Sequence, residues 1–467
     1  MTLTTEPIKK TMMTMIAPAS FGMLMTFLFQ LVDTYFVGKL GTSQLAAVSF
    51  AYPIYILVVG LFMGIGAGIS SVVGKALGEE NTDKSKSIIM LSQVFFMILT
   101  VGIGVAGYYA ITPVFSALGA STEMLPLVAD YMEVIYLGML FLVGTLITNA
   151  SLMAKGVMIK TTIIMAIGGL VNLVLDYVLI FGMGSIPAME LQGAGLATVI
   201  SWMVTFILMN ILLLKEGLFS FSGFKNFAKA KTQLKEVLTI GGPAVAAQIL
   251  NPIAIAVITR VVSKYGEEAI AAYGIATRVE SLGLTGVLAL SVIMTPLVAQ
   301  NYGAKIMERI DQIIVYAGKT TVYWSIALLA ILIFFSGNIA AIFTDNATVI
   351  ANAKYYFIIV GLSFPGFGLA LVSTSFFNGV YQPKKSLNLT LIKSLAFTIP
   401  LALLGSFWQL EGIWIGIAVA NVLGAIYSDR LLKGWMRENN SSLVNANVIM
   451  AYMDDMKYVF SKLGWRK

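Results

Sequence analysis

Long apolar stretches separated by short polar connections recur along the whole chain of 467 residues. Each stretch is long enough for an α-helix to cross roughly 30 Å of hydrocarbon, which takes about 20 residues. Read against the Gly, Pro and charged residues that interrupt them, the stretches predict twelve helices. These helices span residues 11–37, 46–74, 88–111, 126–152, 161–182, 194–214, 237–262, 268–298, 314–335, 354–378, 386–405 and 412–432. The pattern therefore predicts an all-α polytopic membrane protein.

Composition agrees with this reading and excludes several kinds of site. Hydrophobic residues make up 58% of the chain and charged residues only 11%, and the mean hydropathy is +0.87. The chain has no Cys and no His, so it has no disulfide, no thiolate nucleophile and none of the commonest metal ligand. We therefore expect no cofactor, no catalytic residue and no enzymatic activity.

Lys and Arg orient the predicted helices. If the N-terminus is cytoplasmic, the inner connections hold Lys75, Lys84, Lys86, Lys155, Lys160, Lys215, Lys225, Lys229, Lys231, Lys235, Lys305, Arg309, Lys384 and Lys385. The outer connections then hold only Lys39, Lys264 and Lys354. This asymmetry predicts a multi-pass protein of the inner (plasma) membrane with both termini in the cytoplasm. The net charge of +7 fits contact with anionic membrane lipid, and without a soluble basic domain we expect no nucleic-acid partner.

The two halves of the chain resemble each other. Pro18 and Pro243 are 225 residues apart (243 − 18), and Gly41 and Gly266 share that offset. Farther along, "LMAKGVMIKT" (152–161) aligns with "FFNGVYQPKK" (376–385). Because each half has an even number of helices, both enter the membrane from the same side, which predicts a parallel repeat. Two six-helix bundles of this kind enclose a central cleft and suit alternating access.

The repeat and the polar connections divide the chain into four parts. We expect an N-terminal lobe at 1–215, a cytoplasmic linker at 216–236, a C-terminal lobe at 237–436 and a tail at 437–467. In the tail, apolar residues recur at helical spacing with charges between them, which predicts an amphipathic helix in the cytoplasm or at the membrane interface.

Polar side chains of the first half gather at one depth. Asp33, in "FLFQLVDTYFVGKLG" (27–41), lies about five residues, or roughly 8 Å, from the outer end of its helix. Asp176, Thr198 and Tyr131 lie about as far from the outer ends of theirs, and Asn172 lies one turn from Asp176 on the same face. The sequence therefore predicts one polar layer built from four helices.

The two carboxyl groups of this layer point to function. A lone Thr or Tyr in such a helix is usually structural, but an unpaired charge in a membrane costs several kcal/mol and marks a functional site by default. No Lys or Arg of the first half lies at the depth of Asp33 and Asp176. The second half has Ile258 at the position equivalent to Asp33 and no acid in its first or fourth helix, so we expect the coupling chemistry in the first half.

The segments "LVDTYFVGKLGTSQLAA" (31–47), "NLVLDYVLIFG" (172–182) and "GAGLATVIS" (193–201) are similar to motifs of multidrug and toxic compound extrusion (MATE) transporters, and the chain resembles their DinF-like branch. The resemblance implies a V-shaped pair of six-helix lobes that expels cationic, aromatic compounds in exchange for H⁺ or Na⁺. It also implies that Asp33 is the principal coupling carboxylate.

Further residues take roles from the same resemblance. Asp176, Asn172, Thr198 and Tyr131 match the polar network of that carboxylate, and Pro18 matches the proline at which the first helix bends. The same oxygen-bearing side chains of Asp33, Asp176, Asn172 and Thr198 could also hold Na⁺. The acid in the seventh helix of other branches is absent here, which argues against a cation site in the second half.

Three charged residues of the second half are weaker candidates for a cavity. They are Arg278 and Glu280, which could pair with each other or with a polar network or else contact substrate, and Lys393 in the middle of its predicted helix.

Other function classes remain open. A lipid-linked oligosaccharide flippase of the same wider superfamily is the alternative function, although it would need a strongly cationic cleft. An intramembrane enzyme or a channel fits less well, because no nucleophile or metal site is visible and a repeat of two lobes favours rocking. We expect small cationic or aromatic substrates, contact with membrane lipid, and a monomer.

Overall fold

The computed structural model describes residues 3–441 and 443, without the side chains at 222, 225 and 227. This part of the chain is helical, with one isolated β-bridge between Met183 and Ile186. It contains ten helices long and apolar enough to cross a membrane, or eleven when one bent pair counts as a single span. One of the ten, the run Pro383–Glu438, folds back on itself at Gly405–Gly412 and so contains two predicted helices. The twelve-helix, all-α prediction is confirmed.

The described chain forms two compact units. The first unit comprises residues 18–245, and the second comprises residues 3–17 together with residues from 246 onward. Residues 3–17, which the sequence assigned to the N-terminal lobe, therefore pack in the second unit. Residues 216–245, predicted to begin with a separate linker, pack in the first. The chain changes unit within two long helices, at Pro18 and after Val245.

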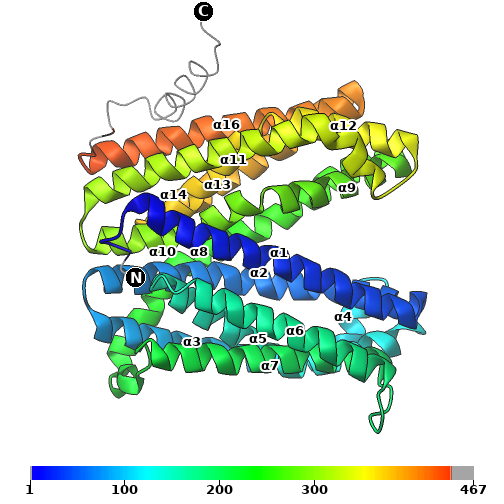
Figure 1. Ribbon diagram of the computed structural model, residues 1–467, viewed down its shortest axis with the longest axis horizontal. Helices are drawn as coiled ribbons and strands as arrows, with labels where there is room; N and C mark the ends of the chain where they lie inside the picture. Colours follow the sequence, from blue (N-terminus) through cyan, green and yellow to red (C-terminus); the bar gives the residue numbers. More distant parts are fainter. Residues whose placement is uncertain (1–2, 442, 444–467) are drawn as a thin grey trace, which may run out of the picture. The chain divides into compact units, whose positions relative to one another are not determined.

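The first unit is a bundle of long helices in which α3, α5, α6 and α7 run side by side (Figure 1). Glycines allow the closest approaches: a Cβ on Gly138 of α5 would stand 2.3 Å from Val199 of α7. Its elements are α1 (Ile8–Leu40, from Pro18), α2 (Thr42–Gly78), α3 (Thr82–Tyr109), α4 (Ile111–Ala117), α5 (Met124–Ala154), α6 (Ile159–Phe181), α7 (Glu190–Lys215), η1 (Phe221–Lys225) and the first part of α8 (Phe227–Val262).

The second unit repeats this arrangement with more interruptions, and α11, α13 and α16 lie alongside one another in it (Figure 1). Its elements, after the rest of α8, are η2 (Ser263–Tyr265), α9 (Glu267–Gly283), α10 (Thr285–Gly303), α11 (Met307–Ala341), α12 (Ala347–Gly361), α13 (Phe364–Gly379), α14 (Pro383–Leu391), the π-helix η3 (Ile392–Thr398), α15 (Ile399–Gly405), η4 (Ser406–Trp408) and α16 (Gln409–Glu438).

Two helices predicted as continuous are broken in the structure. The span 268–298 divides into α9 and α10, and the span 354–378 divides into α12 and α13 with a bend of 58°. Pro365 stands in the first turn of α13; it has no N–H to continue the preceding helix and its ring would clash with the carbonyl four residues earlier, which explains the second break. The predicted linker is also largely ordered, because α8 already begins at Phe227.

The N-terminal segment is tied to the second unit by hydrogen bonds, and α16 extends beyond its predicted end. Arg309 Nη2 donates hydrogen bonds to the carbonyls of Leu3 (3.1 Å) and Glu6 (2.8 Å), and Asn301 Nδ2 donates to the same Leu3 carbonyl. These bonds hold the N-terminal segment within the second unit. At the other end α16 continues to Glu438, and the amphipathic helix predicted in the tail lies, from residue 444 on, outside the described residues.

Candidate functional site

Two carboxyl groups meet inside the first unit. Asp176 on α6 is only 1% exposed, and Asp33 on α1 is half-buried. The two carboxyls lie close enough to interact electrostatically. Two ionised carboxylates so placed repel each other, and a proton on either one relieves that repulsion. The pair is therefore a place where a single proton can be held.

The contacts of Asp176 leave one of its two oxygens without a donor among the described residues. Its Oδ1 accepts a hydrogen bond from Nδ2 of Asn172, one turn earlier on α6, at 3.4 Å. Its Oδ2 is buried and meets no N–H or hydroxyl donor among the described residues. Because an unsatisfied buried carboxylate oxygen is costly, protonation of the Asp33–Asp176 pair removes an electrostatic penalty.

The sequence brings these groups together through small residues on α6. A Cβ added to Gly169 would lie 2.0 Å from the ring of Phe29 on α1, and one added to Gly168 would lie 2.0 Å from Oγ1 of Thr205 on α7. The two glycines therefore allow α6 to pack closely against both neighbours. Asn172 and Asp176 follow one and two turns later, near the same face.

Tyr131 and Thr198 relate differently to the carboxyls. The phenol of Tyr131, on α5, interacts electrostatically with Asp33, Asp176 and Tyr55. The hydroxyl of Thr198 instead donates to the carbonyl of Ala194 at 3.0 Å, and in the described structure it makes no hydrogen bond to either carboxyl. The structure thus joins four of the five predicted residues and leaves Thr198 as a neighbour on α7.

An aromatic pair not predicted from the sequence lies beside this site. Tyr55 of α2 interacts electrostatically with Asp33 and stacks on Trp202 of α7, with ring centroids 6.3 Å apart and planes 10° apart. Trp202 follows Thr198 by one helical turn. The carboxyl pair is therefore flanked by flat aromatic surfaces, of the kind that attract cations and planar rings.

Basic residues and metal-binding clusters are absent from this site in the described structure. No Lys or Arg forms an ion pair with Asp33 or Asp176, and Lys39 lies instead over the ring of Tyr35 at 5.1 Å. No group of three or more acidic, His or Cys side chains stands close enough to hold a metal among residues 3–441. Among the described residues, the carboxyl pair therefore has no basic partner.

Pro18 lies where α1 passes from one unit to the other. Its ring removes the backbone N–H that would close a helical turn, and its carbonyl accepts a hydrogen bond from Oγ1 of Thr162 on α6 at 3.2 Å. A hydroxyl on the helix of Asp176 thus contacts the backbone of α1 at this proline.

The second unit holds a separate polar group. Tyr356 of α12 donates a hydrogen bond to Oε2 of Glu280 on α9 at 2.5 Å, and Lys393 Nζ lies 4.1 Å from the ring centroid of Phe367. Arg278 is exposed and is not the partner of Glu280, because residues two apart on a helix face in different directions. Of the pairings expected for Glu280, the described structure shows one within a polar network and none with Arg278.

The repeat contained a signal for this second group. Tyr356 and Glu280 stand 225 residues after Tyr131 and Tyr55 (356 − 131 and 280 − 55), the same offset that relates Pro18 to Pro243. Glu280 was already a candidate from the sequence, and its pairing with Tyr356 follows when this offset is applied to Tyr55 and Tyr131.

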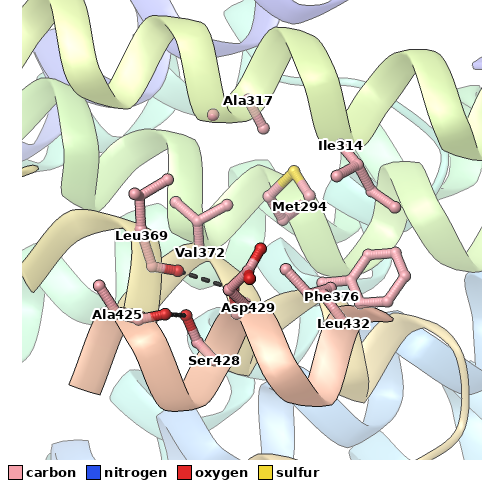
Figure 2. Close-up of a pocket in the computed structure, with 12 residues that line it drawn as sticks. Met294, Ile314, Ala317, Leu369, Val372, Phe376, Ala425, Ser428, Asp429 and Leu432 are labelled. Atoms are coloured by element: carbon pink, nitrogen blue, oxygen red, sulfur yellow. Dashed lines mark hydrogen bonds between the residues drawn. The ribbon is translucent and has the colours of Figure 1, made fainter. Parts of the chain in front are cut away.

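A cavity in the second unit is too small for a transported molecule. It measures about 30 Å³, room for one or two waters, and its lining is mostly apolar. Figure 2 shows Asp429 among these side chains, and its Oδ2 forms an ion pair with Lys433 at 2.7 Å. This cavity is a packing feature, and the substrate site is sought elsewhere.

Comparison with known proteins identifies the family. The MatE family model matches residues 18–178 and again 243–404, one match in each half of the chain. The chain belongs to the MatE family. The match also confirms the MATE resemblance inferred from the sequence, and the assignment to the DinF-like branch stays a prediction.

Individual relatives of this MatE chain carry different names. The FAD transporter of Shewanella oneidensis is 31% identical over 426 residues, which cover 91% of this chain and 94% of that protein. The probable multidrug resistance protein YoeA of Bacillus subtilis is 26% identical, covering 84% and 86%. The fold matches the crystal structure of the Vibrio cholerae MATE transporter VcmN in the bent form, with a TM-score of 0.87 at 24% identity, covering 92% and 97%.

Proposed function

We propose that this MatE-family chain is a secondary active efflux transporter in which the Asp33–Asp176 pair couples export to inward movement of H⁺. The observation that supports this most directly is the buried Oδ2 of Asp176, which has no donor in the described structure and lies on a carboxyl that interacts with Asp33, since a proton on the pair removes this penalty. The chain is a member of a transporter family, and two acidic groups with no basic partner inside its helices suit a reversible charge.

The proposed cycle uses this pair as a switch. With one proton bound, the pair carries one negative charge and the protonated carboxyl can donate to the other. When the proton leaves, two negative charges share the site and a cation is attracted. One charge moving inward yields about 2.3 kcal/mol per 100 mV of membrane potential, enough to drive accumulation against a gradient.

Sodium is the competing coupling ion. Carboxylates suit Na⁺, but Asn172 turns its N–H group toward Asp176, and the hydroxyl of Thr198 donates to backbone. Both groups would have to reorient to become ligands. This arrangement favours H⁺, and transport with and without Na⁺ distinguishes the two ions.

The substrate class follows from the surroundings of the carboxyls. Tyr131 and the stacked pair of Tyr55 and Trp202 offer aromatic faces next to a negative centre, which favours cationic, aromatic compounds. Export of a flavin dinucleotide is the second candidate, because a relative named FAD transporter shares 31% identity across nearly the whole chain. FAD also has a planar, aromatic ring system, but it carries the negative charge of its phosphates.

The remaining properties complete the proposal. We place the protein in the inner membrane with both termini in the cytoplasm, following the distribution of Lys and Arg. It acts as a monomer on small molecules within a lipid bilayer, without nucleic acid and without a bound cofactor.

Purified protein in liposomes tests the function. An imposed pH gradient across the liposome membrane, inside-acid or inside-alkaline, should drive ethidium transport. Addition of ethidium should in turn move protons in the direction opposite to ethidium. Neither movement should require Na⁺. A parallel series with FAD separates the two substrate candidates. Expression in a pump-deficient bacterium should lower its sensitivity to ethidium. If neither compound moves and lipid-linked sugar is translocated instead, the flippase is the correct assignment.

A further inference from the structure

Lys393 presents a positive charge in the middle of a membrane-spanning helix of the second unit. Ten residues of this helix precede it from Pro383, and twelve follow it to Gly405. Its Nζ lies 4.1 Å from the ring centroid of Phe367. Within the described structure no carboxylate or carbonyl accepts a hydrogen bond from it. A half-buried ammonium at this depth therefore keeps its three N–H donors available.

The surrounding backbone fixes the position of this side chain. A Cβ added to Gly424 of α16 would lie 3.1 Å from Cγ and 3.3 Å from Cδ of Lys393, so the aliphatic stem lies along the space that this glycine leaves. Lys393 is also in the π-helix η3, where its carbonyl accepts a hydrogen bond from Oγ1 of Thr398 at 2.9 Å. Pro400, lacking an N–H, interrupts regular helical bonding just beyond.

Glu280 does not neutralise this charge by direct contact. Its carboxylate accepts a hydrogen bond from Tyr356 and attracts Lys393 only through space. Tyr356 in turn packs against Trp414, with ring centroids 4.9 Å apart. Glu280 is thus held by its own partners, while the ammonium lies over an aromatic face with no acceptor.

We propose that Lys393 binds an anionic group, a phosphate or carboxylate, of an aromatic substrate, with the ring of Phe367 beside it. The ammonium is a compact charge that suits phosphate, and burial away from bulk water strengthens the attraction. This inference rests on the proposed efflux function and adds a second recognition element, of opposite charge to the Asp33–Asp176 pair and located in the other unit.

Two flavins that differ only in a phosphate test the proposal. Flavin mononucleotide and riboflavin are titrated onto purified full-length protein in nanodiscs, and binding is followed by flavin fluorescence anisotropy. Wild type should bind the mononucleotide more tightly than riboflavin. Lys393→Gln should weaken mononucleotide binding by about tenfold or more, the order expected for a hydrogen bond to a charged group, and leave riboflavin binding unchanged. Lys393→Arg should retain most of the preference.

Lys354→Gln is the matched control, because it removes the same charge from an exposed position on α12 of the same unit. It should bind both flavins as wild type does. The proposal is overturned if wild type does not prefer the mononucleotide, or if Lys393→Gln weakens both flavins equally, which would indicate a structural role. Ethidium export is measured on wild type and on the same variants. If wild type exports no ethidium, the efflux function itself is contradicted. If wild type exports ethidium but shows no preference for the phosphate-bearing flavin, only the role of Lys393 is contradicted.

Discussion

Tyr356 stands 225 residues after Tyr131 (356 − 131), and each tyrosine interacts with a carboxyl group of its own unit. In the first unit, Tyr131 interacts electrostatically with Asp33 of α1. In the second unit, Tyr356 donates a hydrogen bond to Glu280 of α9, which stands at the repeat position of Tyr55. The two halves therefore keep a tyrosine in place and supply its acidic neighbour from different helices.

This difference predicts that the acids of the first unit, Asp33 and Asp176, are essential for coupling and that Glu280 of the second unit is not. Asp33→Asn should abolish ion-driven export while the protein stays folded and inserted, because an amide keeps the shape of the side chain but cannot cycle a proton. Asp176→Asn should reduce export severely, since it removes the second carboxyl of the Asp33–Asp176 pair. Initial efflux rates at equal membrane abundance, measured across a pH series, check both. Full efflux by Asp33→Asn would remove Asp33 from the coupling role.

Glu280→Gln should impair the export of cations only mildly. Glutamine keeps an oxygen that accepts the hydrogen bond of Tyr356, and Glu280 shares no proton with a second carboxyl in the described structure. The same efflux assay provides the comparison. Arrested transport in Glu280→Gln, together with an unchanged rate and pH profile in Asp176→Asn, would move the coupling site into the second unit.

Tyr356→Phe should destabilise the second unit more than Glu280→Gln does. It leaves the half-buried carboxylate of Glu280 without its donor, which costs about 1–3 kcal/mol. Thermal unfolding of the purified variants in detergent measures the difference. The double variant Tyr356→Phe with Glu280→Leu should recover part of the loss, because both partners of the hydrogen bond are then apolar. Equal unfolding temperatures for wild type and Tyr356→Phe would show that the bond contributes nothing.

Pro18→Ala should slow transport without reducing the amount of folded protein. Alanine restores a backbone N–H and stiffens α1 at the point where the helix passes between the two units. Pro53→Ala is the control, since Pro53 also lies inside a helix of the first unit but away from that boundary. Efflux rates at matched abundance decide the matter, and identical losses in both variants would argue against a special role for Pro18.

The helices and the common depth of the two acidic residues could be predicted from the sequence, because both depend only on the spacing of residues along a single helix. Burial of apolar runs determines the spans, and helical rise places Asp33 and Asp176 at one depth. Contacts between helices were harder to foresee. The stacking of Tyr55 on Trp202 and the bond from Tyr356 to Glu280 depend on side-chain packing across α2, α7, α9 and α12.

Breaks within predicted helices were missed for a related reason. The 58° bend between α12 and α13 lies inside an apolar stretch whose hydropathy does not change. The π-helix at 392–398 likewise has an ordinary sequence apart from Pro400 beyond its end. Hydropathy indicates which segments are long and apolar enough to cross the membrane. It carries no information on the local hydrogen-bond register of a helix, so the bend and the π-helix are seen only in the packed structure.

Close packing of α15 against α16 gives the last prediction. A Cβ added to Gly416 would lie 2.3 Å from the carbonyl oxygen of Leu401, a backbone atom that cannot move aside alone. Gly416→Ala should therefore destabilise the protein by about 1–3 kcal/mol, the usual cost of overpacking. Gly434→Ala on the same helix meets nothing within 4 Å and should be neutral or stabilising by about 0.5–1 kcal/mol, because alanine favours helix over glycine. Unfolding temperatures of the two variants, measured side by side in detergent, make the comparison. If Gly416→Ala unfolds at or above the temperature of Gly434→Ala, the close approach of α15 and α16 is wrong, and so is the position of Gly424 on α16 beside Lys393 of η3, the segment directly before α15.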